Sequence, residues 1–128
     1  PPVVALADLK AAKLAALDAA CAAAIVGGFG RGALGAPHTY PSKAPDQTNL
    51  MGSVVAAMLP GLPGGWTTPF WCADGAAEWA FRDHTAAQII AAGVDGKTHV
   101  VTCQARLASL AAEVATAPDA AAVAAISW

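Results

Sequence analysis

Large apolar residues recur at helical spacing along most of the chain. Between residues 5 and 26 they lie close to one stripe, the lysines fall off it, and Gly27-Gly28 then supplies the backbone that ends a helix. We therefore predict a helix over 5–26. Its opposite face is mostly alanine, which leaves two interpretations open: an ordinary core helix, or a coiled-coil seam.

Glycine and proline punctuate the next segment, 27–45, which we predict to be a long irregular loop. Loops of this length are often functional in compact domains. Asp46 is then expected to cap a second helix over 46–58, because its carboxylate can accept hydrogen bonds from amides of the first turn. Pro60 and the glycines after it end this helix.

The segment 70–82 carries the one convincing β signal. Two short runs with aromatic residues flank an Asp74-Gly75 pair, which is a frequent hairpin turn. Because an isolated two-stranded hairpin is marginal in water, we expect its Trp and Phe side chains to pack on a helical body.

A short helix is predicted directly after the hairpin, over 85–92. Thr85 and Gln88 match a capping box, in which the two side chains bond to each other's backbone amides. Gly93 is the expected end of this helix.

Two more helices complete the predicted fold. Asp95 is expected to cap a helix over 96–115, whose apolar residues recur at alternating steps of three and four. A last helix over 118–126 has proline in its first turn. The fold class is thus mainly α: an irregular bundle of about five helices with one small β-hairpin, forming a single domain over 1–128.

Composition narrows the classes of partner. Hydrophobic residues make up 56% of the 128 residues, but most of the excess is alanine, which favours helices and buries little area. The net charge is −2 and the seven Lys and Arg residues are scattered, which argues against nucleic acid or a membrane surface as the partner. No run reaches the length of a membrane span. Charged residues make up only 12%. A surface with so few charges tends to associate, so we expect the chain to be a subunit of a larger assembly.

Candidate chemistry is sparse. The three cysteines have no CxxC spacing and the three histidines match no metal motif, so we predict no metal, no cofactor and no enzyme activity. The enzyme alternative is a Cys–His nucleophile pair, with Cys72 or Cys103 as the nucleophile and His38 or His84 as the base. We expect His84 instead to bond at the start of the 85–92 helix and His99 to lie on the exposed side of its helix.

The candidate binding residues are polar side chains near two predicted helix starts, together with two tryptophans of the hairpin. They are His38, Tyr40, Asp46, Gln47, Asn49, Trp71, Trp79, His84 and Gln88. For the polar members two interpretations stay open: a hydrogen-bonded network or binding surface, or helix capping and loop anchoring. Trp66, Trp71 and Trp79 are the expected anchors of an interface, since aromatic residues commonly fill that role.

Several segments resemble one known family. They are Phe29-Gly30-Arg31-Gly32-Ala33-Leu34-Gly35, His38-Thr39-Tyr40-Pro41-Ser42, Asp46-Gln47-Thr48-Asn49-Leu50, Asp83-His84-Thr85-Ala86-Ala87-Gln88 and Ile126-Ser127-Trp128. The chain is similar in these segments to domain of unknown function 4376, found in tail and tail-fibre proteins of bacteriophages and prophages. The resemblance covers nearly all of the chain after residue 5.

The resemblance implies a structural component of a virion tail, made in the bacterial cytoplasm and often the C-terminal module of a longer chain. It implies docking to other tail proteins within a homo-oligomeric or symmetric assembly. It carries no catalytic residues. The alternative function is a small binding module for a host surface glycan or a tail-assembly partner.

Overall fold

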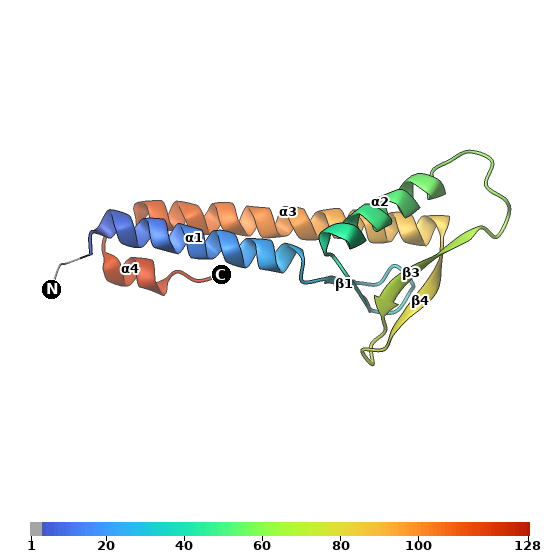
Figure 1. Ribbon diagram of the computed structural model, residues 1–128, viewed down its shortest axis with the longest axis horizontal. Coiled ribbons are helices and arrows are strands. Elements are labelled where there is room, and N and C mark those ends of the chain that lie inside the picture. Colours follow the sequence, from blue (N-terminus) through green and yellow to red (C-terminus); the bar gives the residue numbers. More distant parts are fainter. Residues whose placement is uncertain (1–3) are drawn as a thin grey trace. The chain divides into compact units, whose positions relative to one another are not determined.

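The computed structural model describes residues 4–128, which form four helices and a four-stranded antiparallel sheet (Figure 1). In chain order the elements are α1 (Leu6–Ile25), β1 (Phe29–Arg31), β2 (His38–Tyr40), α2 (Ala44–Ala57), β3 (Thr67–Ala73), β4 (Trp79–Thr85), α3 (Ala86–Thr116) and α4 (Ala120–Ala125). The mainly helical content is confirmed, whereas the prediction of five helices with one hairpin is wrong. No helix in the described range is long and apolar enough to cross a bilayer.

The chain divides into two compact units. The helical unit comprises residues 4–24 and Val101–Trp128, and the sheet unit comprises Ile25–Val100. The first half of α3 therefore belongs to the sheet unit and its second half to the helical unit.

In the helical unit, α1 follows the 5–26 prediction to within one residue at each end. The buried side chains of this unit are Leu17, Cys21, Cys103, Val114, Ala117 and Val123. Helix α4 begins later than the predicted residue 118, because Asp119 is its cap and accepts from the Ala122 amide at 2.8 Å. Lys13 donates through Nζ to the Ile126 carbonyl at 2.7 Å, which fastens the chain after α4 to α1.

In the sheet unit, the predicted loop 27–45 contains the strands β1 and β2, which pair antiparallel. Phe29 lies opposite Tyr40 in this ladder, and both side chains are buried. Strands β3 and β4 extend beyond the predicted hairpin 70–82, and the sheet order is β1-β2-β3-β4. Strands of three residues are too short to show a hydrophobic alternation, so the surrounding glycines concealed them.

Helix α3 corrects the prediction of separate helices over 85–92 and 96–115. A Cβ built on Gly93 would come within 2.6 Å of Val54 Cγ2, and one on Gly96 within 3.2 Å of the Phe29 ring. The two glycines are therefore sites of close approach rather than helix ends, since packing offsets their low helix propensity. Figure 1 shows α2 lying along this half of α3.

The starts of α2 and α3 test the capping predictions. Asp46 is not the cap of α2: the helix begins at Ala44 after Lys43, and the Asp46 carboxylate accepts from the Lys43 amide at 3.0 Å. Asp95 is not a cap either, because it lies inside α3, where it pairs with Arg31 at 3.6 Å. The Thr85 capping box is confirmed by reciprocal hydrogen bonds with Gln88.

We predict that Gly93→Ala destabilises the protein by about 1–3 kcal/mol, the usual cost of overpacking, although alanine is the better helix former. The added methyl group collides with the Val54 side chain. Urea denaturation measures the change in the free energy of unfolding. Combining Gly93→Ala with Val54→Ala should cost less than the sum of the single changes, and a strictly additive pair would contradict this packing.

Candidate functional site

The β3–β4 hairpin separates its aromatic side chains onto two faces. Phe70 and His84 point inward and are buried. On the outer face, Trp71 is 42% exposed, Trp79 44% and Phe81 69%. The register explains the grouping, because Trp71 of β3 lies opposite Phe81 of β4. Trp79 precedes Phe81 by two residues in β4, so its side chain points to the same face. We call Trp71, Trp79 and Phe81 the aromatic face.

Contacts between the rings order the aromatic face. Trp71 and Phe81 meet edge to face with centroids 4.9 Å apart. The planes of Trp71 and Trp79 lie within 19° of parallel at a centroid distance of 6.4 Å. Each geometry is favourable for aromatic pairs, so the three side chains form a preorganised apolar surface.

The hairpin loop is also fixed. Asp74 Oδ1 accepts from the amides of Ala76 and Glu78 at 2.9 and 3.1 Å, and the two bonds lower the pKa of Asp74. The Arg82 guanidinium donates to the Glu78 carbonyl at 2.9 Å and lies 3.5 Å from the Asp74 carboxylate. These bonds hold the two strands in register up to the loop.

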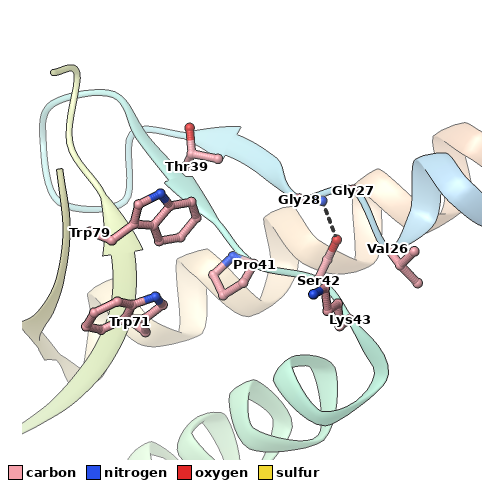
Figure 2. Close-up of a pocket in the computed structure, with 9 residues that line it drawn as sticks. All are labelled: Val26, Gly27, Gly28, Thr39, Pro41, Ser42, Lys43, Trp71 and Trp79. Atoms are coloured by element: carbon pink, nitrogen blue, oxygen red, sulfur yellow. Dashed lines mark hydrogen bonds between the residues drawn. The ribbon is translucent and has the colours of Figure 1, made fainter. Parts of the chain in front are cut away.

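An open groove of about 470 Å³ runs beside the two tryptophans. It is lined by Val26, Gly27, Gly28, Thr39, Pro41, Ser42, Lys43, Trp71 and Trp79. Figure 2 shows the indoles of Trp71 and Trp79 on one side of the groove and Val26 and Lys43 on the other. Its volume lies within the range of small-molecule sites, and its largely apolar walls are also usual for such sites.

Ser42 shapes the floor of the groove. Its buried hydroxyl donates to the Ile25 carbonyl at 2.6 Å and accepts from the Gly28 amide at 2.8 Å (Figure 2). Gly28 has φ +91°, and a Cβ there would come within 2.9 Å of the Tyr40 carbonyl oxygen, so only glycine fits. The backbone between α1 and β1 is thereby fastened to the start of α2.

On the inner face of the sheet, Tyr40 and His84 form a buried hydrogen-bonded pair. His84 Nδ1 lies 2.7 Å from the Arg82 carbonyl and must donate to it, so Nε2 accepts from the Tyr40 hydroxyl at 2.8 Å. Burial lowers the pKa of His84 and raises that of Tyr40 to about 12. The expected bond of His84 at the start of the following helix is therefore wrong.

Most of the other predicted polar residues form their hydrogen bonds elsewhere. Asp46 and Gln88 bond to helix starts, and Gln47 Nε2 donates to the Ser42 carbonyl at 2.8 Å. His38 Nδ1 lies 2.7 Å from the Ala36 carbonyl, and Asn49 is exposed. Of the predicted polar set, the structure thus brings Tyr40 and His84 together and gives Asp46, Gln47 and Gln88 capping or anchoring bonds.

Two further placements differ from the sequence predictions. Trp66 is half-buried and packs against the core of the sheet unit instead of standing free as an anchor. His99 is half-buried, with its ring 5.9 Å from that of Phe29, and not on an exposed helix side. Phe81 was missed, although its position two residues after Trp79 in a predicted strand places it on the same face.

All three cysteines are free and buried, and burial raises the pKa of Cys21 and, despite the nearby Arg82 charge, that of Cys72. No group of three metal-ligating side chains occurs within residues 4–128. What this site can do chemically is present apolar aromatic area beside a groove.

We predict that the stability of the fold decreases as the pH drops below about 6.5, the ordinary pKa of histidine. Because burial lowers the pKa of His84, the unfolded chain takes up a proton there at a higher pH than the folded chain does, which favours unfolding in acid. Urea denaturation between about pH 8 and pH 5 measures the slope.

His84→Gln is the matched control and should reduce this pH dependence of stability. An unchanged slope in that variant would contradict the assignment to His84.

Tyr40→Phe leaves His84 Nε2 without its hydrogen-bond donor and should lower the free energy of unfolding by about 1–3 kcal/mol at neutral pH.

Comparison with known proteins identifies a family but no characterised relative. No match is found among curated proteins or among solved structures. Residues 8–127 match the model of a family described as Domain of unknown function (DUF4376). Since the match spans nearly the whole chain, the protein belongs to the DUF4376 family.

Proposed function

We propose that the chain is a non-catalytic docking module that binds other proteins through the aromatic face. The observation that carries the proposal is the grouping of Trp71, Trp79 and Phe81, three large aromatic side chains left exposed on one ordered strand pair. Aromatic residues held in place in this way lose little conformational freedom on binding and commonly anchor interfaces.

The neighbouring chemistry supports docking over catalysis. The titratable pair on the inner face of the sheet, Tyr40 and His84, is buried and internally satisfied, so it offers no group to a substrate. The sparse charge of the chain also suits a subunit that buries much of its surface in an assembly. The setting we propose, from the family resemblance, is a bacteriophage or prophage tail.

A second candidate function is glycan binding in the groove. The near-parallel indoles of Trp71 and Trp79 border an open groove that also holds Thr39 and Lys43. A sugar ring can stack on an indole while its hydroxyls bond to such polar groups. Docking is the better supported of the two, because the most exposed ring, Phe81, is not part of the groove lining.

We predict that Trp71→Ala and Phe81→Ser each weaken binding to a tail protein encoded beside this chain by at least about tenfold, as expected for hot-spot anchors. Co-purification identifies the partner, and titration calorimetry measures its dissociation constant. Val101→Ala removes an exposed apolar side chain of α3 and is the matched control, with no expected effect.

The same variants separate the two candidate functions. If docking is correct, Phe81→Ser weakens protein binding and a panel of glycans leaves the tryptophan fluorescence unchanged. Saturable quenching by a glycan that requires Trp71 and Trp79 but not Phe81 would favour the glycan function instead. If the tail protein encoded beside this chain binds wild type, Trp71→Ala and Phe81→Ser with equal affinity, docking through the aromatic face is refuted.

A further inference from the structure

Among the glycines inside the described helices, Gly52 of α2 has no internal explanation. Gly93 and Gly96 are required by close contacts with Val54 and Phe29. A Cβ on Gly52, in contrast, would meet nothing within 4 Å. Glycine is a poor helix former, and no packing within the chain requires it here, so the helix backbone at Gly52 is open to close approach from outside.

Gly52 lies on an exposed apolar surface of the same helix. Met51 is 67% exposed, Val55 56%, Met58 70% and Leu59 57%. These four residues, which we call the α2 stripe, follow helical spacing, and the Met58 and Leu59 amides continue the helical bonding just past the end of α2. The opposite side of the helix already packs into the core through Leu50 and Ala57.

The α2 stripe lies in an uncharged segment of the chain. No charged residue occurs between residues 47 and 73, so the stripe offers no electrostatic feature by which a charged partner would be selected. A second copy of the chain brings the same uncharged surface, and pairing two copies there buries no ionised group.

The α2 stripe is also complementary to itself. In an antiparallel pair of α2 helices centred on Val55, a residue faces the residue of the second copy that lies on the same side of Val55, one helical turn the other way. Met51 of one copy then faces Met58 of the other, and Gly52 faces Leu59. The Leu59 side chain thus meets the one position without a side chain, which is how a knob fits a hole.

We propose that α2 is a homodimerisation helix, which pairs antiparallel with α2 of a second copy about a two-fold axis at Val55. Burying the exposed parts of the α2 stripe on both copies removes on the order of 1,000 Å² from water, near the lower limit of specific interfaces. The dimer is therefore expected to be reversible, with a dissociation constant in the micromolar range. The aromatic face takes no part in this contact.

Sedimentation equilibrium of the 128-residue chain from about 1 µM to about 1 mM tests the proposal. The mass should rise from monomer to dimer and no further, because a two-fold contact closes on itself. Val55→Glu should leave a folded monomer over the whole range. Val101→Glu, at an exposed valine outside α2, is the matched control and should dimerise like wild type.

Gly52→Ala distinguishes a binding role from a structural one. Alanine fits without a clash, so the monomer should become more stable, with a melting temperature higher by about 3–6 °C. The dimer should weaken at least about tenfold, because the new methyl group fills the space that Leu59 of the second copy needs.

Three results would overturn the proposal. They are a wild-type chain that stays monomeric up to about 1 mM, a Val101→Glu variant that loses the dimer as Val55→Glu does, and a Gly52→Ala variant that dimerises unchanged. Trp71→Ala is expected to dimerise like wild type. The dimer test therefore does not depend on whether the aromatic face binds another protein.

Discussion

The packing of the sheet unit depends on the close approach of α2 and β1 to the backbone of α3 at two glycines. Because Gly93 and Gly96 have no side chains, Val54 and the Phe29 ring approach the helix backbone directly. Phe29 stacks on Tyr40 at 5.4 Å, and Tyr40 bonds to His84. This chain of contacts fixes the inner face of the hairpin, and the alternation of the strands then turns its remaining aromatic residues outward.

The same glycines show which parts of the fold could be predicted from the sequence and which could not. Periodicity located α1 and α2 to within two residues, and Thr85 with Gln88 identified the start of α3. Gly93 was misread because a helix end and a helix–helix contact use the same residue, and only the tertiary neighbour distinguishes them. Trp71 and Trp79 were predicted as binding residues, but the expectation that the hairpin aromatics pack on a helical body is wrong for them, because they lie on the outer face of the strands and only Phe70 points inward. The pairing of Tyr40 with His84, 44 residues apart, leaves no local pattern.

Two surfaces of the sheet unit are apolar in different ways. The aromatic face consists of rings held by one another, which suits a partner of fixed shape. The α2 stripe relies on Met51 and Met58, whose flexible side chains adapt to what they meet. A chain with few charges has limited means of choosing partners by electrostatics, so the shapes of these surfaces must supply the specificity.

The sheet order leaves the outer edge of β4 without a neighbouring strand among residues 4–128. A seven-residue edge is a template onto which another chain can add as a strand, and the exposed Phe81 makes such addition more favourable. Arg82 and Asp83 follow directly after it, and charges at an edge oppose uncontrolled pairing. The β4 edge therefore combines an exposed aromatic ring with adjacent charges, so a strand that adds to it must accommodate both.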